Sequence, residues 1–349
     1  MTEKIKYVHI GLPKNLSTTL QRDFFSKHPE IMHLGVGINS NVGYINSRIS
    51  SACENHFQYS NKYSYKKAYT DILCAFDEQF ENFQKNSKKK ACGISLELLS
   101  FSFTTDHIDI EDKAKRIYEV FGNNTRIILI IREQFKLIES LYREVVKIGF
   151  QGTFKEYLYF IYYLRDRNFI FNFDYSYLVN LFSGFFGSDN VSIIPMEFYR
   201  SSRGKLIYQD NSCLLTDMLC TILGLSKFNG SMSHHNNTLP DAVIHQMIKI
   251  NKVKRHGIGN DMYGFGANFH RLKDYFRNEI EIEIPDEILY HDVKIKNANI
   301  DEAWRNISRD TSITYEYPIE IRRFLENLFK KSNHDLQQKL DYNLPEEYF

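Results

Sequence analysis

The sequence predicts an α/β protein with a central parallel sheet flanked by helices and a mostly helical C-terminal part. Strand-like runs alternate with helical patterns up to about residue 200, which is typical of βαβ units. The β-branched run over 125–131 is nearly continuous, as in a parallel strand buried on both faces. With 349 residues, 43% apolar and 25% charged, the chain is not collagenous, disordered or coiled-coil. We expect one domain over 1–349, with a core of about 5–240 and a helical extension of about 241–349.

The expected elements follow in chain order. Strands are predicted from β-prone runs bounded by Gly, Pro or Asn, at 5–10, 91–96, 125–131 and 190–195. Helices are predicted from apolar spacings of three and four residues, at 17–27, 63–83, 113–121, 134–148, 212–224, 238–253, 268–281 and 316–331. Residues 28–56 are rich in Gly, Asn and Ser and predict an exposed loop that covers an acceptor.

Charge and cysteine content limit the classes of function. The chain has 44 Lys plus Arg against 43 Asp plus Glu, so no basic field favours nucleic acid or an anionic membrane. The five cysteines are odd in number and form no C-x-x-C pair, which indicates reduced thiols. The chain start lacks the apolar stretch of a signal peptide, and no apolar run is long enough to span a membrane. We therefore expect a soluble cytoplasmic protein whose anion site is local.

The loop G-L-P-K-N-L-S-T-T at 11–19 stands between the first predicted strand and helix, where exposed N–H groups and the helix dipole attract anions. It is not a Walker A motif, which places Gly-Lys directly before Ser or Thr. Lys14 lies upstream of the hydroxyl cluster Ser17, Thr18 and Thr19. These hydroxyls could bind a terminal phosphate while Lys14 approaches its far side. The alternative is an ordinary strand-to-helix turn capped by Ser or Thr.

The stretch V-H-I-G-L-P-K-N-L-S-T-T-L-Q resembles the 5'-phosphosulfate loop, P-K-x-G-T-T, of sulfotransferases that use 3'-phosphoadenosine 5'-phosphosulfate (PAPS). Leu16 and Ser17 stand where that family commonly has a small residue and Gly. The resemblance implies PAPS as co-substrate and a P-loop-like sulfotransferase fold. It assigns the donor's phosphosulfate to the loop residues Lys14, Asn15, Leu16, Ser17, Thr18 and Thr19.

The family's second motif is a strand that ends in Arg, with a Ser eight residues later on a helix. Here Arg132 ends the run at 125–131 and Ser140 follows at that spacing. The resemblance assigns both to the 3'-phosphate, with a charge-assisted contact from Arg132. The alternative is a surface salt bridge for Arg132 and a solvent-facing hydroxyl for Ser140. The likeness covers roughly 5–240 and is closest to bacterial, carbohydrate-directed members.

Sulfuryl transfer requires a deprotonated acceptor hydroxyl and stabilisation of the leaving phosphate oxygen, and Lys14 is the candidate for the second task. The family's base lies just past the strand after the first long helix, which here indicates Glu97. A carboxylate that only caps a helix is the alternative. We expect Ser95 to orient the acceptor or touch the sulfonate. The rival bases lie in polar stretches expected to be exposed, namely His33, His56 and His107.

The resemblance therefore implies a PAPS-dependent sulfotransferase acting on a hydroxyl, with a carbohydrate as the favoured acceptor and no metal or nucleic acid partner. His234 and His235 lack ligands at metal-binding spacing. We expect the aromatic residues of segment 157–177 to pack in the core. The alternative is that several of these rings face a sugar acceptor. A P-loop nucleotide or small-molecule kinase, or a catalytically inactive nucleotide-binding protein, remains the other reading. The sequence specifies neither the acceptor nor the oligomeric state.

Overall fold

The computed structural model describes residues 4–36, 43–102, 107–165, 170–201, 205–210, 212–233, 239–254, 293–307 and 313–349. The chain divides into two compact units that are interleaved in sequence. The first, which we call the sheet unit, comprises Met1–Glu133, Phe171–Asn236 and Leu328–Phe349. The second, which we call the helical unit, comprises Gln134–Ile170 and Asn237–Asn327. The predicted helix at 268–281 and the residues His234 and His235 lie outside the described residues.

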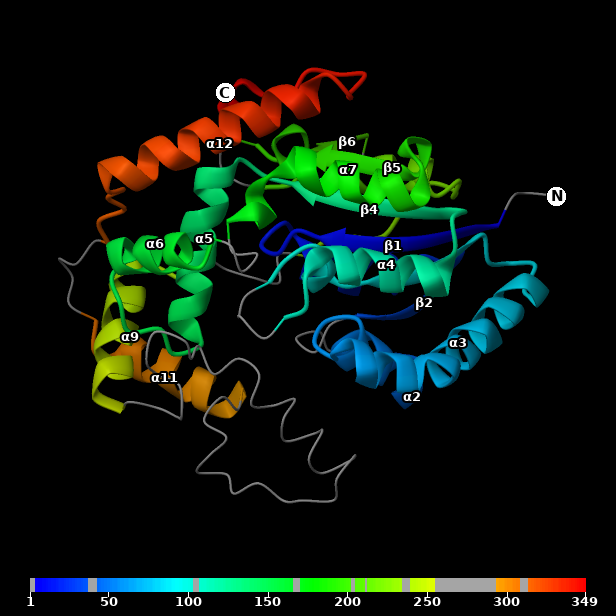
Figure 1. Cartoon of the computed structure of the whole chain (residues 1–349), viewed down its shortest axis with the longest axis horizontal. Coiled ribbons are helices and arrows are strands. Elements are labelled where there is room, and N and C mark those ends of the chain that lie inside the picture. Colours follow the sequence, from blue (N-terminus) through cyan, green and yellow to red (C-terminus); the bar gives the residue numbers. More distant parts are fainter. Residues whose placement is uncertain are drawn as a thin grey trace. The chain divides into compact units, whose positions relative to one another are not determined.

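The sheet unit is built on a five-stranded parallel sheet, and the predicted α/β class is confirmed (Figure 1). The strand order is β2-β3-β1-β4-β5. The strand bounds are β1 Ile5–Gly11, β2 Ile31–Val36, β3 Ala91–Ser95, β4 Thr125–Ile131 and β5 Val191–Pro195. All four predicted strands are present. β4 is paired on both sides and nearly all of it is buried, which explains its continuous β-branched sequence.

The predicted exposed loop at 28–56 was wrong for part of its length. It contains β2, which pairs with β3 at the sheet edge, and the short helix α2 (Ser47–Ser51). Gly35 sits at a register shift between β2 and β3, so the strand lacks a regular alternation of apolar residues. That irregularity hid an edge strand inside a Gly-rich segment.

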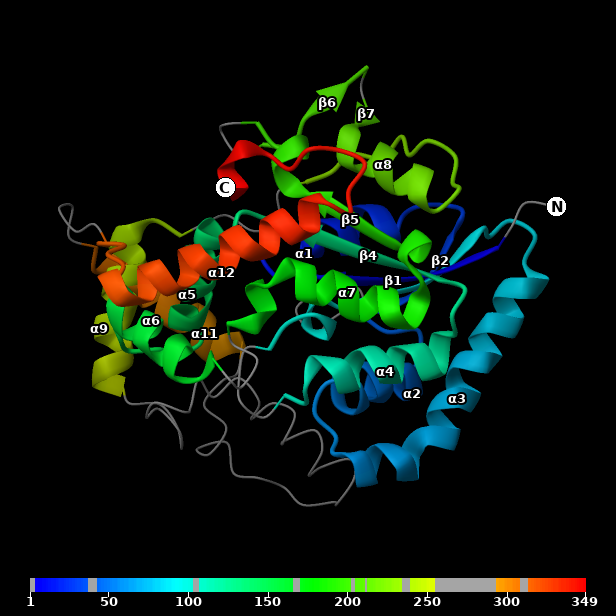
Figure 2. The same ribbon diagram turned by 45° about the horizontal axis from the view of Figure 1, so that its top comes forward.

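Helices cover both faces of this sheet. On one face, α1 (Ser17–Thr19) continues directly into the π-helix η1 (Leu20–Phe25), and α8 (Leu214–Ile222) packs on the same core cluster. On the other face α7 (Tyr175–Phe186) contacts β4, β5 and α4 (Ile110–Phe121), as Figure 2 shows. The remaining elements of this unit are η2 (Ala52–His56), α3 (Lys62–Lys85), β6 (Tyr208–Gln209) and β7 (Ser212–Cys213).

The helical unit contains α5 (Gln134–Lys147), α6 (Phe154–Tyr163), α9 (Asp241–Lys254) and α11 (Val293–Arg305). Thr153 and Glu156 form a capping box that starts α6. Tyr157 and Phe160 of α6 are buried, so the aromatic segment serves in part as core, whereas Tyr159 and Tyr163 are 48% and 64% exposed. The predicted helical C-terminal part is confirmed in α9, α11 and α12 (Ile319–Gln337). Within the described residues no helix combines the length and apolar character that crossing a membrane requires.

Candidate active site

The loop between β1 and α1 has an unusual backbone. Three residues take left-handed conformations: Gly11 with φ 104°, Lys14 with φ 66° and Leu16 with φ 65°. Leu16 precedes the helical Ser17 directly, and such a left-handed to right-handed step turns successive N–H groups toward one point, where an anion can bind. This backbone therefore presents main-chain donors at the predicted phosphate position.

The start of α1 has no side-chain cap. The N-cap position is Leu16, whose apolar side chain makes no capping hydrogen bond. The Ser17 hydroxyl instead donates back to the Leu12 carbonyl oxygen at 3.4 Å. The N-cap residue is therefore not a Ser or Thr, as the alternative of an ordinary capped turn requires.

Two hydrogen bonds anchor this loop to the sheet. The Leu12 N–H and the Asn15 Nδ2 group donate to the same carbonyl oxygen of Ile130 on β4, at 3.0 and 2.8 Å. Asn15 is fully buried, and its Oδ1 atom has no hydrogen-bond partner among the described residues. The side chain of Asn15 thus fixes the position of the loop. The contact of Asn15 with PAPS remains a prediction.

Glu97 lies against the loop. It begins the 3₁₀ turn η3 (Glu97–Leu99) directly after β3, and a Cβ atom placed on Gly11 would lie 2.8 Å from the Glu97 Cα atom. β1 and β3 pair with His9 opposite Ser95, so the two strands end side by side. The Leu96 N–H donates to the His9 carbonyl oxygen at 2.8 Å. The structure therefore brings the half-buried candidate base next to the candidate phosphate loop.

A buried lysine fixes the chain that follows Glu97. Lys113 of α4 is completely buried, and its ammonium donates to the carbonyl oxygens of Leu98 and Phe101, each at 2.8 Å. It also contacts Ser102 Oγ at 3.2 Å and His107 Nδ1 at 3.1 Å. Main-chain carbonyls thus replace water around this charge, and the turn that carries Glu97 cannot shift freely.

The three rival histidines were wrongly expected to be exposed: His107 is buried, and His33 and His56 are half-buried. His33 lies on β2, where its Nδ1 atom is 2.7 Å from the Tyr7 hydroxyl and burial lowers its pKa to about 3. His107 is buried, with the Tyr59 hydroxyl 2.7 Å from its Nε2 atom and Lys113 at its other nitrogen. His56 lies in η2 and contacts the Ser60 hydroxyl. His33 thus lies in a strand and His107 in a packed turn, and neither ring lies in an exposed loop.

Sequence reasoning missed a buried network at the ends of β1 and β3. His9 Nδ1 lies 2.7 Å from Ser95 Oγ, and Gln21 Nε2 donates to Ser95 O and Oγ at 3.1 and 3.2 Å. Burial lowers the pKa of His9 to about 3, so the ring is neutral at pH 7. Ser95 is completely buried in this network, and its contact with the acceptor or the sulfonate remains a prediction. The sequence feature that could have indicated this network is the position of His9 near the end of the first predicted strand.

The second predicted motif is divided between the units. Arg132 directly follows β4, and the Tyr175 hydroxyl donates to its carbonyl oxygen at 2.5 Å. Its half-buried guanidinium forms no ion pair with any residue that the structure describes, so the salt-bridge alternative does not hold. Ser140 lies within α5 of the helical unit and is half-buried. The joint role of Arg132 and Ser140 remains a prediction.

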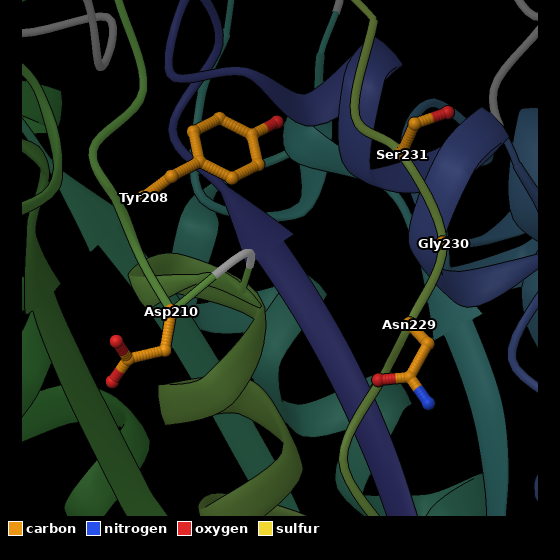
Figure 3. Close-up of a pocket in the computed structure, with 5 residues that line it drawn as sticks. All are labelled: Tyr208, Asp210, Asn229, Gly230 and Ser231. Atoms are coloured by element: carbon orange, nitrogen blue, oxygen red, sulfur yellow. The ribbon is translucent and has the colours of Figure 1, made fainter.

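A separate cavity of about 590 Å³ lies in the sheet unit. Figure 3 shows its two sides, one formed by the β6–β7 hairpin and the other by the segment after α8. Its lining residues are Tyr208, Asp210, Asn229, Gly230 and Ser231. None of the residues predicted from the sequence lines this cavity.

No protein-family model matches the chain, and no curated protein matches its sequence. Among solved structures, the chain is similar to the crystal structure of a sulfotransferase from Alicyclobacillus acidocaldarius, at 16% sequence identity and a TM-score of 0.44. That alignment covers 84% of this chain and 99% of the other.

Proposed function

We propose that this protein is a sulfotransferase that moves the sulfuryl group of PAPS to a hydroxyl of an acceptor. The observation that carries the proposal is the pairing of an uncapped, left-handed loop at residues 11–16 with the Glu97 turn held against Gly11. The loop supplies main-chain donors for an anion, and the turn supplies a carboxylate beside it. The sequence resemblance at Lys14 and at Arg132 supports PAPS as that anion.

In the proposed reaction the acceptor oxygen attacks the sulfur atom, and a new S–O bond forms as the bond to the 5'-phosphate oxygen breaks. That bonding pair leaves with 3'-phosphoadenosine 5'-phosphate (PAP), and the acceptor proton goes to the Glu97 carboxylate. The first-turn N–H groups at Ser17, Thr18 and Thr19 hold the 5'-phosphate. The Lys14 ammonium stabilises the charge that develops on the leaving oxygen. Positioning and electrostatic stabilisation carry such a transfer, as they do for phosphoryl groups.

We favour a carbohydrate as the acceptor. Several tyrosine rings are exposed: Tyr159 is 48%, Tyr163 64% and Tyr208 47% exposed. A tyrosine ring offers flat apolar area with a polar tip, which suits the face and hydroxyls of a sugar.

The test combines PAPS with separate panels of glycans, phenols and lipids, and measures released PAP together with the sulfated product. We expect release that depends on a glycan acceptor. Lys14→Ala should lower turnover by about 10² to 10³, and Glu97→Gln by about 10² to 10⁴. Matched control variants are Lys88→Ala and Glu81→Gln, which change exposed residues of the same types.

Two results would contradict the proposal. A fully active Lys14→Ala variant removes Lys14 from the mechanism. Transfer of phosphate from ATP to the same acceptors, with no turnover of PAPS, replaces the sulfotransferase with a kinase.

A further inference from the structure

Two arginines follow neighbouring strands of the sheet unit at their carboxyl ends. β4 and β5 pair with Ile131 opposite Pro195, and Arg132 is the next residue after β4. Arg200 follows the single 3₁₀ turn η7 (Met196–Tyr199) that continues β5. Ligands of open α/β sheets bind outside the carboxyl ends of the strands, so both side chains lie at the edge where a ligand is expected.

Hydrogen bonds fix the two turns to each other. Glu197 of η7 accepts from the Glu133 N–H through Oε1 at 2.9 Å, and from the Tyr348 hydroxyl through Oε2 at 2.7 Å. Tyr175 donates to the Arg132 carbonyl oxygen at 2.5 Å and its ring packs near that of Tyr348. Both oxygens of Glu197 thus accept hydrogen bonds from neutral donors, which hold this carboxylate in place.

No ion pair among the described residues neutralises the charge of Arg132 or Arg200. Arg200 is half-buried, and its Nε atom is buried with no hydrogen-bond partner among the residues that the structure describes. Burial lowers the pKa of Arg200, and the nearby charge of Arg132 lowers it further, while Glu197 offsets part of this effect. Arg132 likewise has no ion pair in the described part of the chain. Two half-buried like charges held near each other favour the binding of an anion.

We propose that Arg200 is the second guanidinium of the site that receives the 3'-phosphate, beside Arg132. This inference rests on the proposed function, which supplies PAPS as the ligand. A phosphate monoester carries a charge of about −1.5 to −2 at pH 7 and has three acceptor oxygens. It can therefore accept hydrogen bonds from two guanidinium groups at once. Arg200 belongs to none of the sequence motifs, and only the pairing of β4 with β5 brings it to Arg132.

The experiment measures the affinities of PAP and of AMP, which lacks the 3'-phosphate, by calorimetry. The proteins are the wild type, Arg200→Gln, Arg200→Lys and the control Arg126→Gln. Arg126 lies at the opposite end of β4, where its guanidinium donates to the Asp189 carbonyl oxygen. We expect Arg200→Gln to weaken PAP binding about 10- to 100-fold while AMP binding stays within about twofold. Arg200→Lys keeps the positive charge but loses the planar guanidinium that can donate two hydrogen bonds to one phosphate. Its affinity for PAP should therefore lie between those of the wild type and Arg200→Gln.

The outcomes separate this inference from the function on which it rests. If the wild type prefers PAP and neither Arg200 variant changes the ratio of PAP to AMP affinity, Arg200 does not bind the phosphate and the proposed function is unaffected. If the wild type binds PAP and AMP equally, both the 3'-phosphate site and PAPS as donor are overturned. Thermal unfolding without ligand serves as the folding control. Because Arg200→Gln removes a charge that repels Arg132, its melting temperature should equal or exceed that of the wild type.

Discussion

Replacement of Gly11 by alanine tests the contact between the candidate phosphate loop and Glu97. The added Cβ atom would lie 2.8 Å from Glu97 Cα and 2.9 Å from its Cβ and carbonyl oxygen. At φ 104° a residue with a side chain is also strained. The left-handed conformation costs about 1–2 kcal/mol, and overpacking costs about 1–3 kcal/mol. We therefore expect Gly11→Ala to lower the free energy of unfolding by about 2–5 kcal/mol.

The assay is equilibrium unfolding in urea. The m-value should be the same for the variant and the wild type, which shows that both expose the same amount of surface on unfolding. The matched control is Gly184→Ala in α7, where an added Cβ meets nothing within 4 Å. That variant should be more stable by about 0.5–1 kcal/mol, because alanine favours a helix interior. A Gly11→Ala protein within about 0.5 kcal/mol of the wild type would refute the close packing of Glu97 on the loop.

Two further predictions concern buried ionisable groups. Lys113→Met leaves four acceptors around the Glu97 turn without their donor, and should cost about 3 kcal/mol or more in the free energy of unfolding. His9 and His33 have pKa values of about 3 when folded, against an ordinary value of 6.5. Protonation therefore favours the unfolded chain, and stability should fall as the pH drops from about 6.5 toward 3, by up to about 1.4 kcal/mol per pH unit for each ring.

Both predictions have controls on the surface of the protein. Lys115→Met changes a lysine of α4 whose side chain is 61% exposed, and should alter stability by less than about 0.5 kcal/mol. A Lys113→Met protein as stable as this control would contradict the buried role of Lys113. For the pH dependence, urea unfolding at several pH values should show a smaller slope in His9→Gln and an unaltered slope in His334→Gln, which changes an exposed ring. An unaltered slope in His9→Gln would show that His9 is not buried in its neutral form.

The parts of the fold that the sequence predicted correctly are those with a strong local pattern. β4 was placed residue for residue, because a strand buried on both faces must be apolar throughout. β2 was missed because it is a short edge strand interrupted at Gly35, where pairing with β3 and not local propensity defines it. The burial of His33 depends on that same pairing, so the ring was mistaken for a loop residue.

In the candidate site, too, local sequence predicts some features, and others depend on strand pairing and packing. Lys14 and Glu97 could be placed at strand ends from the sequence, but the contact of Glu97 with Gly11 follows from the pairing of β1 with β3. The burial of Ser95 beside Gln21 could not be predicted, because it depends on how η1 packs on the sheet. No local sequence pattern indicates Arg200 as a site residue, because its position near Arg132 depends on the turn that follows β5.

The central claim is that the loop after β1 binds the 5'-phosphate of a 3'-phosphorylated nucleotide. A crystal structure with PAP bound tests it most directly. We predict the 5'-phosphate at the N–H groups of Ser17, Thr18 and Thr19, with the 3'-phosphate between Arg132 and Arg200. A nucleotide bound elsewhere, for example in the cavity beside Tyr208, with the loop at residues 11–16 free of phosphate, would contradict the claim.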